Sequence, residues 1–64
     1  MNLEKLRKKS GYSQQEFAAL VGVTQSAVSQ WENGLVLPTT KKLVEIASVL
    51  RCTTDDLLKP TSAD

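Results

Sequence analysis

Apolar residues along the 64-residue chain recur at intervals of three or four positions, in short runs separated by glycine, proline, threonine and asparagine. This spacing is that of the buried face of an amphipathic α-helix, whereas a half-buried strand needs strict alternation of apolar and polar residues. The sequence contains no alternating run long enough for a strand, and no internal repeat. The pattern therefore predicts an all-α protein built from five short helices.

The first two helices are delimited by residues that start and stop helices. Asn2 can cap a first helix, and Gly11 suits the left-handed conformation that follows a helix C-terminus. Ser13 and Glu16 have the spacing of a capping box, so a second helix should begin at Gln14. The apolar stripes of these two helices consist of Leu3, Leu6, Phe17, Leu20 and Val21.

A third helix follows after a short break. Gly22 interrupts the second helix, and Thr24 is a good N-cap for the next one. Val28 and Trp31 lie three residues apart, so both should point inward. The Asn-Gly pair at 33–34 tolerates positive φ and should end this helix.

Two further helices complete the chain. Pro38 disfavours helix for the residue before it and suits the start of a fourth helix, with Thr39 or Thr40 as the cap. The apolar stripe of the fourth helix consists of Leu43, Ile46, Ala47 and Leu50. Thr53 and Asp56 are spaced as in a second capping box, which opens a short fifth helix.

A chain of this length forms one domain at most, and a domain of about 60 residues buries only about 60% of the surface that its unfolded chain exposes. We expect the domain to cover residues 1–59 and residues 60–64 to form a flexible C-terminal tail, because Pro60 stops the last helix. The net charge is only +1, but residues 1–42 are basic and residues 43–64 are acidic. Such asymmetry is compatible with a polyanion bound on one side.

Several classes of protein are excluded by residues that the chain lacks. Cys52 is the only cysteine and there is no histidine, which rules out a disulfide, a Cys/His metal site and His-based catalysis. We expect Cys52 to be a small, partly buried apolar residue. Without a nucleophile beside a base or a Gly-rich phosphate loop, no enzyme, cofactor, metal or small-molecule ligand is expected. No apolar run approaches the roughly 20 residues of a membrane span and no signal peptide is evident, so we expect a cytoplasmic protein.

The second and third helices meet the requirements of a helix-turn-helix. Ala18 is small enough to let the two helices cross closely, Gly22 supplies the turn, and Val28 fills the angle between them. The outer face of the third helix carries only uncharged polar residues, namely Gln25, Ser26, Ser29, Gln30 and Asn33. An exposed helix face more often collects Lys and Glu. Because Gln and Ser suit hydrogen bonds to base edges, this face indicates DNA recognition, with an ordinary polar face as the alternative.

The stretch SQQEFAALVGVTQSAVSQWENG, followed by Pro38, resembles the helix-turn-helix of the lambda-repressor/Cro-like (XRE-type) DNA-binding proteins. The resemblance extends from Leu3 to Leu58. It implies a compact five-helix domain that binds double-stranded DNA as a homodimer and regulates transcription. The helix of residues 24–32 would lie in the major groove.

The resemblance also assigns roles to single residues at matching positions. The base-reading positions of the family correspond to Gln25, Ser26 and Gln30, and Ser29 lies on the same face. Its phosphate-contacting positions correspond to Gln14 and Asn33, and Lys41 or Lys42 would add positive charge along the same strand.

Arg7 and Glu32 lie at the edges of apolar stripes, four residues after Leu3 and Val28 respectively. The family often pairs these two positions, which implies an ion pair that braces the first helix against the third. Arg7 also has enough donors to offer one edge of its guanidinium to a phosphate.

The connector after the third helix departs from the family pattern, because Leu35, Val36 and Leu37 occupy a loop that is commonly more polar. An exposed apolar patch of this kind would be a liability in a monomer. The segment either folds back onto the core or joins Leu57 and Leu58 in a two-fold dimer contact, and we favour the dimer contact.

The sequence therefore predicts a sequence-specific transcriptional regulator, most simply a repressor, that binds a pseudo-palindromic operator as a homodimer. The alternative is an antitoxin-like or other protein-binding module with the same fold. An acidic or apolar outer face on the third helix would have favoured that alternative, and the Gln/Ser face does not.

Overall fold

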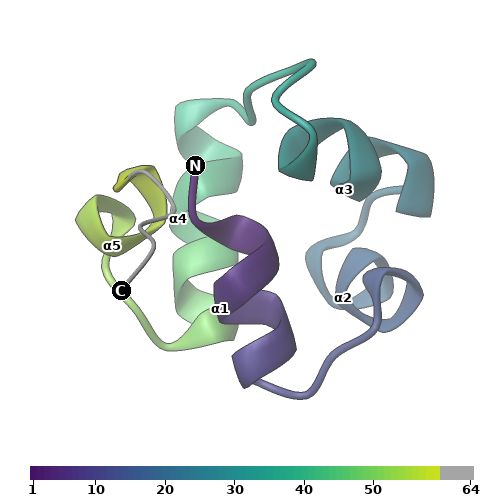
Figure 1. Ribbon diagram of the computed structural model, residues 1–64, viewed down its shortest axis with the longest axis horizontal. Helices are drawn as coiled ribbons and strands as arrows, with labels where there is room; N and C mark the ends of the chain where they lie inside the picture. The colour runs from purple at the N-terminus through teal and green to yellow at the C-terminus, as the bar shows by residue number, and fades with distance from the viewer. Residues whose placement is uncertain (60–64) are drawn as a thin grey trace.

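The computed structural model describes residues 1–59, which form five α-helices and contain no strand (Figure 1). The helices are α1 (Leu3–Lys9), α2 (Gln14–Val21), α3 (Gln25–Glu32), α4 (Thr40–Leu50) and α5 (Thr54–Leu58). The prediction of an all-α, five-helix protein is confirmed. The predicted C-terminal tail, residues 60–64, lies outside the described residues.

All five helices contribute to one apolar core. In Figure 1, α2 and α3 lie on one side of the molecule and α5 on the other, with α1 and α4 between them. The buried apolar side chains are Leu3, Phe17, Ala18, Val21, Val28, Trp31, Ile46, Ala47, Leu50 and Leu57. None of the helices within residues 1–59 is long and apolar enough to cross a membrane.

Hydroxyl caps begin four of the helices. The Ser13 hydroxyl accepts from the Glu16 amide at 3.0 Å while the Glu16 carboxylate accepts from the Ser13 amide at 2.9 Å, so the predicted capping box is present. Thr24, Thr39 and Thr53 accept in the same way from the amide three residues ahead. These bonds satisfy backbone donors that the first turn of a helix would otherwise leave without a partner.

Asn2 does not cap α1 with its side chain, so that prediction was wrong. A capping residue takes extended backbone angles, but Asn2 has φ −99° and ψ 26°, and its side-chain oxygen is buried without a hydrogen bond to any described residue. The Asn2 backbone N–H instead donates to the Leu57 carbonyl at 2.8 Å. The start of α1 is therefore tied to α5.

Leu20 is half exposed, although the periodicity placed it in the apolar stripe of α2. Successive side chains of a helix are rotated by about 100° about its axis. Phe17, Ala18 and Val21 therefore form the middle of the buried face of α2, and Leu20 lies at its edge. It borders a shallow groove that is also lined by Val44 and Val49 of α4.

Candidate nucleic-acid interface

The polar residues of α3 form an exposed face, which we call the reading face: Gln25, Ser26, Ser29 and Gln30. Three of these side chains are exposed and Ser29 is half buried. On the opposite side of the helix, Val28 and Trp31 are buried in the core, as predicted. The helix is therefore anchored by its apolar residues, and its uncharged polar residues are left facing outward.

The turn between α2 and α3 has helix-turn-helix geometry. Gly22 adopts φ 79°, a left-handed conformation that an L side chain would strain. The amides of Gly22 and Val23 both donate to the Ala18 carbonyl at 2.9 Å, which closes the end of α2 before the chain turns. Ala18 itself is buried in the core.

Arg7 of α1 and Glu32 of α3 form an ion pair inside the fold. Arg7 Nε donates to Glu32 Oε2 at 2.6 Å and Arg7 Nη2 donates to Glu32 Oε1 at 3.2 Å. The two side chains are only 6% and 3% exposed. The hydrogen bond to Glu32 raises the pKa of Arg7 above its usual value, against the opposing effect of burial, so the guanidinium stays charged.

The third guanidinium nitrogen of Arg7 is also engaged. Nη1 donates to the backbone carbonyl of Tyr12 at 2.7 Å, in the loop between α1 and α2. Because the side chain is buried and each of its nitrogens has a partner within the fold, it offers no edge to a phosphate. The prediction of a phosphate contact by Arg7 was therefore wrong, and the residue joins α1, α3 and the loop before α2.

Gln14, at the start of α2, lies between Glu32 and the reading face. Its Nε2 donates to Glu32 Oε1 at 2.9 Å, and its Oε1 accepts from Gln25 Nε2 at 3.4 Å. The sequence indicated Gln14 only as a phosphate contact and gave no sign of either bond. Its neighbours are 18 and 11 residues away along the chain, so only the fold brings them together.

The predicted phosphate contacts differ in how far the fold already occupies them. Lys42 Nζ donates to the Val21 carbonyl at 3.0 Å and to Glu45 Oε2 at 2.8 Å, so it joins α4 to the end of α2. The hydrogen bond from Lys42 also lowers the pKa of Glu45 below its usual value. Lys41 is exposed. Asn33 is exposed as well, and its Nδ2 donates weakly to the Ser29 hydroxyl at 3.4 Å.

The connector between α3 and α4 does not fold back onto the core. Leu35 and Leu37 are 74% and 71% exposed and Val36 is half exposed, so the first of the two readings is wrong. Leu58 is also half exposed, but Leu57 is completely buried. Leu57 therefore cannot contact a second copy of the chain, and its place in the predicted dimer contact is corrected.

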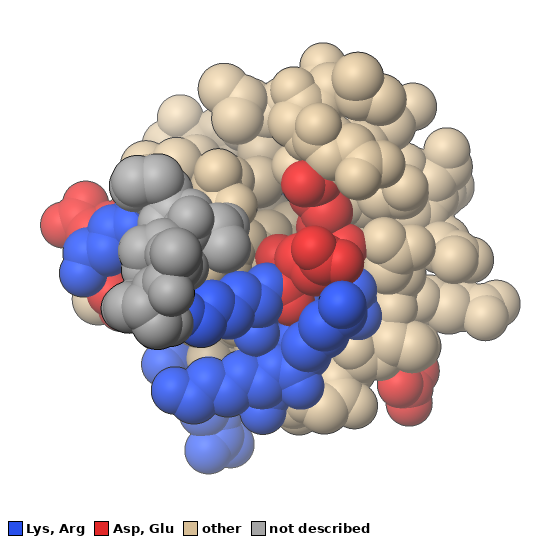
Figure 2. All heavy atoms as spheres, viewed as in Figure 1, with Lys and Arg blue, Asp and Glu red and all other residues tan. Residues whose placement is uncertain are grey.

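Positive charge is concentrated on one part of the surface in the view of Figure 2. On this side of the molecule Lys and Arg gather over α1 and toward α5, whereas the surface over α2 and α3 is mostly uncharged. The four residues of the reading face are themselves uncharged, so any contact that they make would depend on directed hydrogen bonds more than on charge.

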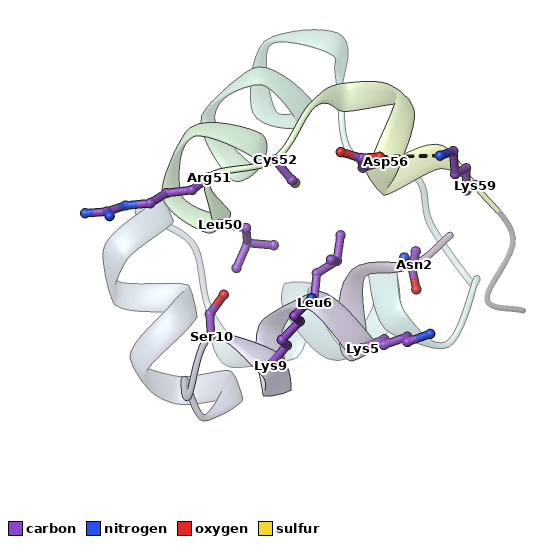
Figure 3. Close-up of a pocket in the computed structure, with 10 residues that line it drawn as sticks. All are labelled: Asn2, Lys5, Leu6, Lys9, Ser10, Leu50, Arg51, Cys52, Asp56 and Lys59. Carbon is purple, nitrogen blue, oxygen red and sulfur yellow. Dashed lines mark hydrogen bonds and ion pairs between the residues drawn. The ribbon is translucent and has the colours of Figure 1, made fainter. Parts of the chain in front are cut away.

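A separate cavity of about 600 Å³ lies between α1 and the link from α4 to α5 (Figure 3). Its lining includes Lys5, Lys9, Arg51, Cys52, Asp56 and Lys59, and no predicted site residue. Figure 3 shows Arg51 extending away from the cavity. Partial burial, and secondarily Asp56, raise the pKa of the Cys52 thiol, which fits the expected role of a small apolar residue.

Comparison with known proteins agrees with this geometry. A family model described as helix-turn-helix matches residues 3–57, and the chain belongs to this helix-turn-helix family. The resemblance to its XRE-type, lambda-repressor-like members is confirmed.

Three relatives illustrate the match. The chain is 39% identical over 61 residues to the SPbeta prophage-derived uncharacterized HTH-type transcriptional regulator YonR of Bacillus subtilis, covering 95% of this chain and 56% of YonR. It is 35% identical over 54 residues to the uncharacterized HTH-type transcriptional regulator YazB of the same organism, covering 84% of this chain and 78% of YazB. It is 38% identical over 53 residues to Repressor protein C2 of Salmonella phage P22, covering 83% of this chain and 24% of C2. The chain thus spans about half the length of YonR and about a quarter of C2.

The Arg7–Glu32 pair generates a stability prediction. Arg7→Met leaves the Glu32 carboxylate buried without its cation and should lower the free energy of unfolding by about 3–5 kcal/mol. The double variant Arg7→Met/Glu32→Met should lose less than Arg7→Met alone, because no unpaired charge is buried. Urea unfolding followed by circular dichroism measures both changes.

Lys8→Met serves as the control. Lys8 Nζ lies 3.3 Å from Glu4 Oε2, but both side chains are exposed, so this ion pair should contribute less than about 1 kcal/mol. Two results would contradict the assignment of a buried ion pair. One is a loss of unfolding free energy in Arg7→Met that is no larger than in Lys8→Met. The other is a double variant that is less stable than Arg7→Met.

Proposed function

We propose that the chain is a sequence-specific DNA-binding transcriptional regulator that acts as a repressor by placing α3 in the major groove. The observation that carries the proposal is the reading face: four uncharged hydrogen-bonding residues on the outer side of a helix-turn-helix, on a helix anchored by buried Val28 and Trp31. The major groove presents donor and acceptor patterns that such side chains distinguish. The names of the relatives, two HTH-type transcriptional regulators and a phage repressor, support the same class.

Within this proposal Gln25, Ser26 and Gln30 read bases, and Ser29 reaches a base or a phosphate. The N-terminus of α2 meets a phosphate, since the unpaired amides and the dipole of a helix N-terminus favour an anion. The Gln14 side chain already bonds Glu32 and Gln25, so its backbone amide is the better donor for that phosphate. Asn33 and Lys41 contact the backbone on the other side of α3, with Lys42 as a secondary contact because of its partners in the fold.

We further propose that two copies bind a pseudo-palindromic site. The exposed apolar side chains of the connector, Leu35, Val36 and Leu37, support this step together with Leu58 of α5. Two recognition helices related by a two-fold axis would meet half-sites about 34 Å apart, one helical turn of DNA. Such a regulator would act in the cytoplasm, where its DNA lies.

Selection of bound duplexes from a random library tests the proposal directly. The expected result is an enriched motif that occurs as an inverted repeat with half-site centres about 10 base pairs apart. Enrichment of a single unrepeated half-site would overturn the homodimer but keep the regulator. No enrichment at all would overturn DNA recognition and favour the protein-binding module.

Replacing Gln25 tests base reading. Gln25→Ala should cost about 1–3 kcal/mol of binding free energy on the selected site and little on random DNA, because it removes a base contact and keeps every proposed phosphate contact. Gel shifts on the two duplexes measure the difference, with Ser48→Ala, at an exposed position of α4, as the control. Equal losses on both duplexes would show that Gln25 is not a base reader.

Replacing the two neighbouring lysines separates a phosphate contact from a structural one. Lys41→Ala should weaken specific and random binding alike and lower the slope of log K against log salt by about one unit. Lys42→Ala should change the slope less, because its ammonium is already held by Val21 and Glu45. Titrations at several salt concentrations measure both slopes, and a larger change for Lys42→Ala would reverse the assignment.

A further inference from the structure

A continuous chain of hydrogen bonds connects the buried ion pair to the reading face. Arg7 Nε donates to Glu32 Oε2 at 2.6 Å, Gln14 Nε2 donates to Glu32 Oε1 at 2.9 Å, and Gln25 Nε2 donates to Gln14 Oε1 at 3.4 Å. We call these four residues the amide relay. It starts at a guanidinium that is 6% exposed and ends at an exposed side chain on α3.

The direction of each bond in the amide relay follows from the chemistry of its buried end. A guanidinium can only donate and an ionised carboxylate can only accept. Glu32 therefore accepts from Arg7 on one side and must also accept from Gln14 on the other. Gln14 has to point its NH₂ group at Glu32, which turns its carbonyl oxygen toward Gln25.

The orientation of Gln14 determines what Gln25 can offer to a base. One N–H of Gln25 is used on the Gln14 oxygen, so one N–H and the carbonyl oxygen are left. Adenine presents an acceptor at N7 and a donor at N6, which this donor–acceptor pair matches. Guanine presents two acceptors, N7 and O6, and the carbonyl oxygen of Gln25 would be repelled by one of them.

We propose that Glu32 is a specificity-determining positioning residue: through Gln14, it orients the Gln25 amide to read adenine and reject guanine. Neither Glu32 nor Arg7 touches a base in this mechanism. The proposal rests on the proposed function, because it assumes that Gln25 reads a base. A good bidentate contact of this kind is worth roughly a 5- to 150-fold preference between bases.

Glu32→Gln tests the proposal because glutamine has nearly the same size but one acceptor and one donor. The oxygen of the new glutamine should keep the 2.6 Å bond from Arg7 Nε. Its NH₂ group then takes the place of Glu32 Oε1 and faces Gln14. The longer 3.2 Å bond from Arg7 Nη2 is lost. Gln14 has to turn its oxygen inward and its NH₂ outward. Gln25 then accepts from Gln14 and presents two N–H donors, which suit guanine.

The measurement is the ratio of dissociation constants for adenine and guanine at the base pair where Gln25→Ala loses discrimination. Wild-type protein should prefer adenine, and Glu32→Gln should abolish or invert that preference. Gln14→Met should abolish the preference for adenine without creating one for guanine. Methionine has neither the N–H donor nor the carbonyl acceptor of the Gln14 side chain. The base pair read by Gln30, identified as the one where Gln30→Ala loses discrimination, serves as the internal control. Because Gln30 is outside the amide relay, Glu32→Gln should leave the preference at that base pair unchanged.

The outcomes separate this proposal from the proposed function. If wild-type protein shows no preference at any base pair, the proposed sequence-specific recognition of DNA fails. If wild-type protein prefers adenine and folded Glu32→Gln keeps the same ratio, the amide relay fails alone.

If Glu32→Gln does not fold, hydrogen exchange of side-chain amides in the wild-type protein gives the answer. The Gln14 NH₂ protons should exchange more slowly than those of exposed Gln15. Equal exchange rates would overturn the proposal.

Discussion

The buried ion pair between Arg7 and Glu32 is the interaction on which the rest of the structure depends. It joins α1 to the C-terminal end of α3, and the remaining Arg7 nitrogen holds the loop before α2 through the Tyr12 carbonyl. Two desolvated charges are costly unless every donor and acceptor is matched, so this geometry tolerates little displacement of the three segments. A domain of about 60 residues has a small core, and apolar packing alone tolerates several arrangements of its helices. The ion pair therefore helps to fix how α1 and α3 are oriented relative to each other.

Much of the fold could be predicted because local signals and periodicity agree. Ser13, Thr24 and Thr53 are each followed by an apolar stripe, and each caps the predicted helix. The failures occur where a local signal competes with a tertiary one. Asn2 has the right side chain for a cap, but its backbone is drawn to the Leu57 carbonyl. Arg51 ends α4 in a left-handed conformation with φ 55°, which an arginine does not predict because positive φ is uncommon for residues other than glycine.

The candidate site could be predicted in position but not in connection. An uncharged face opposite Val28 and Trp31 is visible from spacing alone, because helical periodicity determines which side chains share a side. The bonds of Gln14 to Glu32 and Gln25, and of Lys42 to the Val21 carbonyl, are not visible, since they span 11 to 21 residues and depend on how the helices cross. Adjacent Leu57 and Leu58 illustrate the same limit: a rotation of about 100° separates a core residue from a surface residue.

The reading face is therefore unequal in its freedom to change during evolution. The side chains of Ser26 and Gln30 are exposed and form no hydrogen bond within residues 1–59, so replacing them would disturb neither the core nor any other helix. Gln25 is linked to Gln14 and through it to the interior. Descendants of this protein would acquire new target sequences most readily by drifting at 26 and 30. A change at 25 would also remove the hydrogen bond to Gln14, so its effect would depend on the residue at 14.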